Sequence, residues 1–182
     1  MPRWGLGLVL LLVVATGVEA ASSAPIQVAP GGGTVWVVNP DSGTVARLDP
    51  ATATRTGEFA VGRSPRTLAV TAGAVYVANQ GDDSVTRLAP DGAVVRTREL
   101  EPGCAPYGVV EAGGSVYVSC QGTSELLVLD ANLDPVRTVP LAWPEARALA
   151  VGPDGAVYVT HYVTKEPNNA GHVSVVDPQA GT

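Results

Sequence analysis

Four short stretches of the chain alternate apolar residues with small or polar ones, which is the two-residue period of a β-strand. Each stretch begins with an aromatic residue, at positions 36, 76, 117 and 158, so the spacings are 40, 41 and 41 residues. The stretches cover residues 36–39, 76–79, 117–120 and 158–161. A fixed period near 40 residues indicates a repeat architecture, in which each unit buries its core against the next.

Each repeat contains four strand-like segments, named A to D in chain order. They cover 25–29, 34–39, 44–49 and 55–61 in the first repeat, then 66–71, 74–79, 84–89 and 94–100 in the second. The third repeat gives 107–111, 115–120, 125–130 and 136–141, and the fourth gives 147–151, 156–161 and 172–177. Short connections rich in Gly, Pro, Asp and Asn join the segments, which predicts antiparallel meanders.

A four-stranded meander that repeats at about 40 residues is typical of a β-propeller blade. A β-sandwich also has short, evenly spaced strands, but it does not require a constant repeat length or an aromatic at the same point. We predict an all-β propeller with blades at about 25–62, 64–103, 105–144 and 146–182, the last without its outer strand. We expect an incomplete ring of about four blades. Either a longer chain supplies the remaining blades or a second chain completes the ring.

The first 20 residues follow a different pattern. Arg3 precedes an apolar run over residues 6–15, and small residues surround Ala20. A charged start, an apolar stretch of about ten residues and a small-x-small end are typical of a secretory signal peptide. We predict Sec-type export with cleavage before Ala21, or alternatively after Ala24. A membrane anchor needs about 20 apolar residues, and no cysteine near the cut offers a lipid attachment site. We therefore expect a secreted or periplasmic protein without a membrane span after cleavage.

Composition narrows the classes of function. The net charge is −6 and 15% of the residues are charged, so the sequence lacks the excess of basic residues that is typical of nucleic-acid-binding proteins. It contains no C-x-x-C-H sequence for covalent haem, no G-x-S-x-G and no H-E-x-x-H. We expect no cofactor and identify no catalytic residue.

The repeat also resembles a known family. The segments Tyr-Val-Ala-Asn at 76–79 and Tyr-Val-Thr-His at 158–161, the C segments at 45–49 and 173–177, and the prolines Pro65 and Pro106 resemble the YVTN family of β-propeller repeats. The resemblance covers residues 25–182 and implies an exported bacterial propeller with seven blades, or roughly 280 residues. It also implies that segment A is innermost and D outermost. The D–A and B–C connections then share one face, called here the loop face, and the A–B and C–D connections share the other. The chain departs from the motif at Ala89, Cys120 and His161.

The two cysteines, Cys104 and Cys120, flank the A–B hairpin of the third repeat. Pairing across the turn near 112–114 places Cys120 opposite position 106 and Cys104 opposite position 122. A Cα separation within the ~4.4–6.8 Å range of a disulfide is then attainable. Two cysteines in a secreted chain favour a bridge, so we predict a structural disulfide. Two free thiols or a metal site are the alternatives.

Several residues gather at the channel mouth in the arrangement that the resemblance implies. Alignment of the A segments makes Arg66, Tyr107 and Arg147 equivalent, with Arg63 and Trp143 nearby. Guanidinium groups and aromatic rings hold anionic or planar ligands through forked hydrogen bonds and stacking. The alternative is that these arginines only pair with surface carboxylates.

The fourth repeat carries six extra residues in its B–C loop, between the two histidines of the chain, His161 and His172. Across a hairpin base the two rings could face each other as metal ligands. A metal site needs about three or four ligands, and only Glu166 is an obvious third. The alternative is two solvated histidines at the ends of a loop, and the extended loop itself is typical of a partner-binding segment.

We therefore predict a non-enzymatic scaffold that binds an unknown protein or a small anionic ligand through its loop face. One alternative is a metal-dependent lyase that resembles virginiamycin B lyase, since residues 64–73 and 152–158 look like its repeats; its catalytic His and Glu cannot be placed on this chain. The other alternative is the propeller part of a longer fusion with a redox domain.

Overall fold

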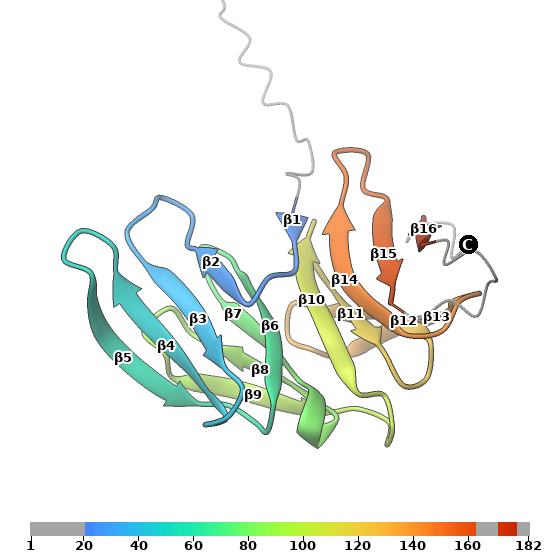
Figure 1. The fold of residues 1–182 in the computed structure, drawn as a ribbon. Coiled ribbons are helices and arrows are strands. Elements are labelled where there is room, and N and C mark those ends of the chain that lie inside the picture. The colour runs from blue at the N-terminus through green and yellow to red at the C-terminus, as the bar shows by residue number, and fades with distance from the viewer. Residues whose placement is uncertain (1–20, 163–170, 178–182) are drawn as a thin grey trace, which may run out of the picture.

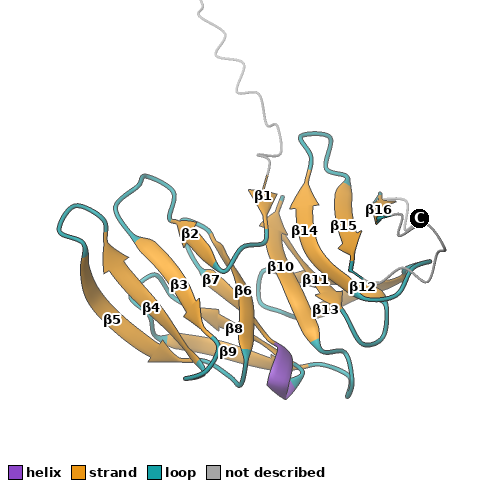
Figure 2. Cartoon of the chain, in the orientation of Figure 1, coloured by secondary structure: helices purple, strands orange, loops and turns teal. Residues whose placement is uncertain are grey.

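The computed structural model describes residues 21–162 and 171–177 and folds them into four antiparallel sheets of four strands each (Figures 1 and 2). The sheets do not close into a ring. The four antiparallel four-stranded sheets confirm the predicted all-β propeller fold. The signal-peptide prediction concerns residues 1–20, which lie outside the described residues. Within the described residues, no helix has the length and hydrophobicity needed to cross a membrane.

The first three sheets are meanders of consecutive strands. The first contains β2 (Ile26–Val28), β3 (Val35–Asn39), β4 (Thr44–Asp49) and β5 (Thr54–Ala60). The second contains β6 (Pro65–Val70), β7 (Val75–Asn79), β8 (Ser84–Leu88) and β9 (Val94–Glu99), with the 3₁₀ turn η1 (Gln80–Asp82) after β7. The third contains β10 (Pro106–Ala112), β11 (Ser115–Cys120), β12 (Glu125–Asp130) and β13 (Pro135–Pro140).

The fourth sheet has the order β1-β14-β15-β16, with β14 (Ala146–Val151), β15 (Val157–His161) and β16 (His172–Val176) in the A, B and C positions. Its fourth strand is β1 (Ala21–Ser22), which pairs with β14 on the side away from β15. The sequence did not lead us to expect β1, because its two residues carry no periodicity. The residues that follow cross from the fourth blade to the second, where Ala24 bridges Leu68, and then enter β2. We call residues 21–25 the N-terminal strap.

The A strands lie side by side at the centre of the arc, and contacts run from β2 to β6, from β6 to β10 and from β10 to β14 (Figure 1). The hydrophobic cores lie between neighbouring blades, because each core cluster combines residues of two or more successive sheets. Trp36, for example, packs with Leu68 and Val77 of the next sheet. Blade stacking therefore supplies the burial that a single sheet lacks.

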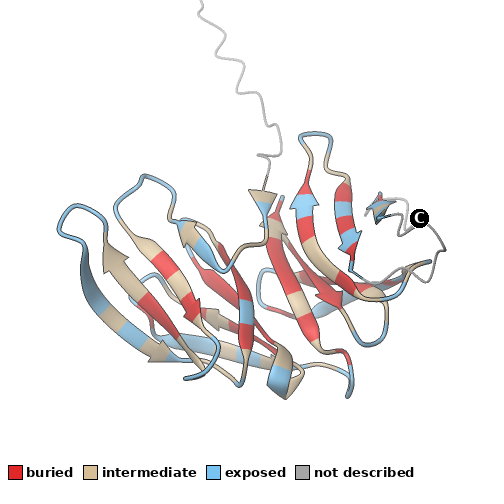
Figure 3. Ribbon diagram, in the orientation of Figure 1, coloured by how far each residue is buried: buried red, intermediate tan, exposed pale blue. Residues whose placement is uncertain are grey.

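Position in the stack decides how strictly burial alternates along a strand. All five residues of β7 are buried, because the second blade is covered on both faces. In β3 and β15, buried residues alternate with more exposed ones (Figure 3). The fourth blade accordingly presents an outward face on which Tyr158 is 39% exposed and Val173 and Val175 are each 57% exposed.

Candidate functional site

The D–A and B–C connections meet on one face, as the resemblance implied. The amide of Gly81 donates to the carbonyl of Arg63 at 2.9 Å, and Gly122 donates to Cys104 at the same distance. In the fourth blade the amide of Tyr162 donates to the carbonyl of Glu145 at 3.1 Å. Each blade from the second to the fourth thus contributes one paired set of loops to the loop face.

The residues before the A strands share a rare backbone conformation. Ser64, Ala105 and Glu145 have φ values of 49°, 47° and 57°, a left-handed region that residues other than glycine seldom adopt. Because the conformation recurs at equivalent positions, it belongs to the blade architecture and is not specific to one site. It turns the chain into the A strand and so places Arg66, Tyr107 and Arg147 at equivalent points on the loop face.

Neighbouring blades fix the backbone at these points. The Thr67 hydroxyl donates to the Tyr107 carbonyl at 2.7 Å, and the Ser119 hydroxyl donates to the Arg147 carbonyl at 2.5 Å. Thr67 is 4% exposed and Ser119 is fully buried. Gly108 permits the close approach of the fourth blade, because a Cβ there would lie 2.4 Å from the Arg147 carbonyl oxygen. Tyr107 and Arg147 therefore rest on a rigid scaffold.

The predicted disulfide is confirmed. Cys104 and Cys120 are bonded, their Cα atoms are 4.6 Å apart, and Cys120 pairs with Pro106 in the hairpin as the counting across the turn predicted. The bond fastens the end of β11 to the D–A turn of the third blade. In the fourth blade, Nδ1 of His161 makes the corresponding link with a 2.9 Å hydrogen bond to the carbonyl of Pro144.

A chain of polar side chains crosses the loop face from the second blade to the fourth. Arg66 donates from Nε to Gln80 Oε1 at 2.6 Å, and Gln80 donates from Nε2 to Gln121 Oε1 at 2.7 Å. Gln121 in turn donates to the carboxylate of Glu145. Both glutamines accept at Oε1 and donate at Nε2, so the chain runs in one direction from a cation to an anion. We call Arg66, Gln80, Gln121 and Glu145 the polar strip.

Arg147 lies at the fourth-blade end of the polar strip. Its guanidinium carbon is 3.7 Å from the ring centroid of Tyr162 and 5.1 Å from that of Tyr107. Its Nη2 is 4.0 Å from the Glu145 carboxylate, which is an ion-pair distance and too long for a hydrogen bond. Its Nε is buried and has no hydrogen-bond partner among the residues that the structure describes. The structure thus brings Tyr107 and Arg147 together and connects Arg66 to them through the polar strip.

Arg63 and Trp143 make other contacts. Arg63 binds Asp82 through its backbone amide at 2.6 Å and through Nε at 2.5 Å. The side-chain hydrogen bond from Arg63 holds the pKa of Asp82 below its ordinary value and raises the pKa of Arg63 itself. Both residues line a hollow of about 410 Å³ between the first and second blades. Trp143 stacks on His172, with ring centroids 3.6 Å apart.

The two histidines are partners across the hairpin, as predicted, but their rings make separate contacts. His161 is 6% exposed and uses both ring nitrogens, since Nε2 lies 2.8 Å from the Ser174 hydroxyl. Because a carbonyl oxygen only accepts, Nδ1 carries the proton that bonds Pro144. In the described part of the chain, no group of three or more His, Cys, Asp or Glu residues could hold a metal ion. The third candidate ligand, Glu166, lies outside that part.

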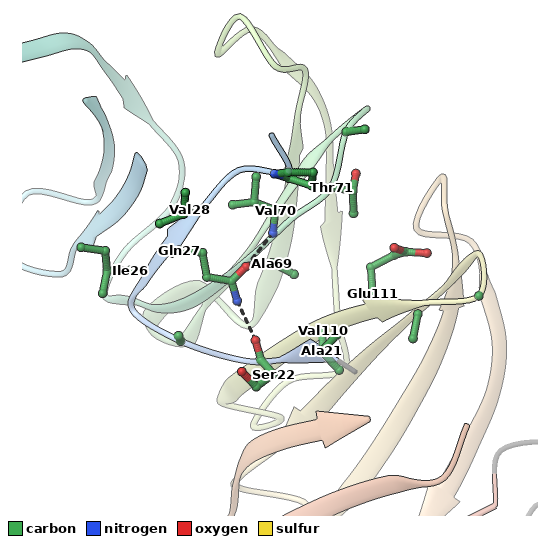
Figure 4. A pocket seen from close by; sticks show the side chains of 15 residues that line it. Ala21, Ser22, Ile26, Gln27, Val28, Ala69, Val70, Thr71, Val110 and Glu111 are labelled. Atoms are coloured by element: carbon green, nitrogen blue, oxygen red, sulfur yellow. Dashed lines mark hydrogen bonds between the residues drawn. The ribbon is translucent and has the colours of Figure 1, made fainter. Parts of the chain in front are cut away.

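The opposite mouth, on the side of the open arc where the A–B connections lie, has a different character. There the N-terminal strap, β2 and the ends of β6 and β10 line a hollow of about 600 Å³ (Figure 4). The Gln27 side chain reaches across it, accepting from the Val70 amide at 2.9 Å and donating to the Ser22 carbonyl at 2.6 Å. Among the described residues the lining is mostly small and apolar, with Glu111 as its one charged residue. In the part of the chain that the structure describes, this lining contains none of the cationic and aromatic groups that occur on the loop face.

Four residues of the loop face were missed from the sequence: Gln80, Gln121, Glu145 and Tyr162. A signal was present, because Gln80, Gln121 and Tyr162 each directly follow one of the four-residue stretches that define the repeat. They are therefore equivalent positions on one face. Their mutual contacts depend on the inter-blade distance, which a sequence period does not give.

No protein-family model and no curated protein matches the sequence. Solved structures do match. The chain is similar to hydrazine synthase of Kuenenia stuttgartiensis, with a TM-score of 0.79 and 25% identity over 86% of this chain and 46% of that one. It is also similar to catalytically inactive virginiamycin B lyase from Staphylococcus aureus with quinupristin, with a TM-score of 0.71 and 17% identity over 89% of this chain and 57% of that one.

A further match is dihydro-heme d1 dehydrogenase NirN in complex with DHE, with a TM-score of 0.69 and 20% identity over 88% of this chain and 36% of that one. The structural neighbours are β-propeller proteins, which agrees with the observed fold. Likenesses at 17% and 20% identity show the fold alone. The chain spans about half the length of the first two matches. The assignment to the YVTN family stays a prediction.

Proposed function

We propose that the protein is exported and acts as a binding scaffold that holds a ligand or partner protein on its loop face. The observation that carries the proposal is the polar strip, which joins side chains of three successive blades in one directed chain of hydrogen bonds. A propeller holds such groups on rigid strands, and loops on rigid scaffolds commonly carry binding functions. Because the lining of the opposite mouth is small and apolar, the loop face is the favoured location of the binding site.

Two features support export. The Cys104–Cys120 disulfide is typical of proteins from oxidising compartments. The pattern of residues 1–20 is that of a signal peptide. Both features together support a secreted or periplasmic location.

The outward face of the fourth blade supports a further part of the proposal. Tyr76 and Tyr117 are 3% and 5% exposed because the following blade covers each of them, whereas Tyr158 is 39% exposed at the equivalent position. We propose that further blades, supplied by a longer chain, cover this face in the working protein. The loop face would then extend over more blades than the four described.

The binding proposal is tested by NMR on the purified protein with a fragment library that contains cationic, neutral and anionic compounds. The side-chain amides of Gln80 and Gln121 report directly on the polar strip. We expect that hits shift these amides and the backbone amides of the D–A and B–C loops. Hits that shift only the A–B turns, or a library with no hits, would contradict the proposal.

Two glutamine variants form a matched pair for this experiment. Gln121→Ala cuts the polar strip, while Gln27→Ala removes a hydrogen-bonded glutamine from the opposite mouth. The first should weaken the binding of loop-face hits and the second should leave it unchanged. Equal losses would show that the effect comes from general destabilisation.

A further inference from the structure

Arg147 differs from the other arginines of the loop face in how its donors are used. Arg63 bonds the Asp82 carboxylate, and Arg66 bonds Gln80. No hydrogen bond from the Arg147 side chain to the described residues is present, and its buried Nε is without a partner. A guanidinium has five N–H donors. Because the Nε–H of Arg147 is buried, the unused donors that a ligand can reach are those of Nη1 and Nη2.

The surroundings of Arg147 hold this guanidinium in place. Its side chain is 27% exposed, its carbon lies over Tyr162 and Tyr107 at 3.7 and 5.1 Å, and Ser119 fixes its backbone carbonyl. Contacts with aromatic rings engage the planar faces of a guanidinium and leave its edges, which carry the N–H groups, for in-plane bonds. Arg147 is therefore a preorganised donor.

The carboxylate paired with Arg147 in the described part of the chain does not satisfy it. The Glu145 carboxylate accepts from Gln121 at the end of the polar strip and stays 4.0 Å from Nη2 of Arg147. Because Glu145 is drawn toward Gln121, the ion pair lacks the two short bonds of a forked arginine–carboxylate pair. A carboxylate from outside the chain could make those bonds.

From these contacts we infer that Arg147 is the anchor for a ligand carboxylate, with Tyr107 and Tyr162 beside it. The inference rests on the proposed binding function and names the ligand class of the same face. A singly charged, planar group with two oxygens matches the guanidinium edge. A phosphate carries more negative charge than a carboxylate. It is disfavoured by the Glu145 carboxylate, which lies 4.0 Å from Nη2 of Arg147, and by the net charge of −6. Next to the anchor, Gln121 and Gln80 offer amides to the neutral part of the ligand.

Benzoate is the probe, with benzamide as its neutral counterpart and inorganic phosphate as the alternative anion. We expect benzoate to bind the purified protein with a millimolar Kd and to shift the Arg147 Nε and Gln121 amide resonances. Benzamide and phosphate should bind at least about tenfold more weakly, since a lost charge-assisted fork changes affinity by that order. Equal binding of benzamide, or tighter binding of phosphate, would overturn the carboxylate assignment.

The variants separate a specific anchor from general electrostatics. Arg147→Gln and Arg147→Lys should each weaken benzoate at least about tenfold, because lysine keeps the charge and loses the fork. Arg63→Gln is the matched control, since it removes the same charge from the same face, and it should change benzoate affinity less than about twofold. Equal losses in Arg63→Gln and Arg147→Gln would refute the anchor. If neutral fragments shift the amide resonances of the polar strip but benzoate does not bind, this inference alone is refuted. If no compound shifts any resonance of the loop face, the proposed function is refuted as well.

Discussion

Truncation of equivalent tyrosines tests whether blade stacking stabilises the fold. Tyr117 and Tyr158 occupy the same position in the third and fourth repeats and are 5% and 39% exposed. Tyr117 belongs to a cluster that includes Leu149, Val157 and Val159 of the fourth blade. Tyr158 lies on the outward face of that blade, where no described sheet covers it. The pair therefore keeps the residue type and the repeat position constant and varies the stacking.

The expected difference follows from the buried area. A large aromatic side chain buries about 150–250 Å², and the two exposed fractions differ by about a third. Tyr158 therefore leaves roughly 70 Å² in water that Tyr117 buries, which corresponds to about 1.7 kcal/mol at ~25 cal/mol per Å². Truncation of a buried aromatic costs about 3–5 kcal/mol. We expect a loss of about 4 kcal/mol for Tyr117→Ala and about 2 kcal/mol for Tyr158→Ala.

Urea unfolding followed by far-UV circular dichroism measures both losses, provided that the slope with urea stays constant among the variants. Tyr76→Ala serves as a second buried member, because Tyr76 is 3% exposed and also donates its hydroxyl to the carbonyl of Ala131 at 2.9 Å. It should lose at least as much stability as Tyr117→Ala. If Tyr158→Ala lost as much as Tyr117→Ala in this chain, the stacking argument would be wrong, because something other than a following blade would then stabilise Tyr158.

Two further predictions concern stability. The disulfide closes a loop with a sequence separation of 16 residues, so its reduction should lower the free energy of unfolding by about 3 kcal/mol. Addition of reductant should lower the urea midpoint of the wild type and leave that of the double variant C104S/C120S unchanged. An unchanged wild-type midpoint would contradict the prediction. The lowered pKa of Asp82 stabilises the folded state above the ordinary aspartate pKa of 3.8, and this contribution is lost as the pH falls through the folded value. Asp82→Asn should therefore flatten the acid limb of the stability curve. An acid limb identical to that of the wild type would argue against the Arg63–Asp82 pair.

The repeat made the fold predictable from the sequence. The first three blades place an aromatic residue, a turn and the following strand at nearly the same spacing, and the fourth differs by six extra residues in its B–C loop. Local periodicity and blade topology therefore give the same answer. The disulfide was predictable for the same reason, because Cys104 and Cys120 lie in one hairpin whose register follows from its turn. β1 and the N-terminal strap escaped prediction, because their pairing with β14 and Leu68 joins segments that are distant in sequence.

The candidate site was predictable only in part. Alignment of the repeats placed Arg66, Tyr107 and Arg147 at equivalent positions, and the structure puts Tyr107 and Arg147 in contact. Arg63 was expected nearby as part of the same binding site, whereas its guanidinium is bonded to Asp82 in a local turn. Whether an arginine is satisfied by its own neighbours depends on atomic distances, which the repeat pattern does not contain.

The sequence by itself determined the strands other than β1 and their antiparallel order within each blade, and the family resemblance added the face on which each loop lies. These properties depend on contacts between residues close in the chain, which the two-residue and forty-residue periods encode directly. The tertiary structure alone decided which side chains meet across blades: Gln80 with Gln121, Gln121 with Glu145, and Arg147 with Tyr107. Those contacts depend on how tightly the blades pack and how the arc curves, because residues about 40 positions apart become neighbours only after the cores between the blades have formed.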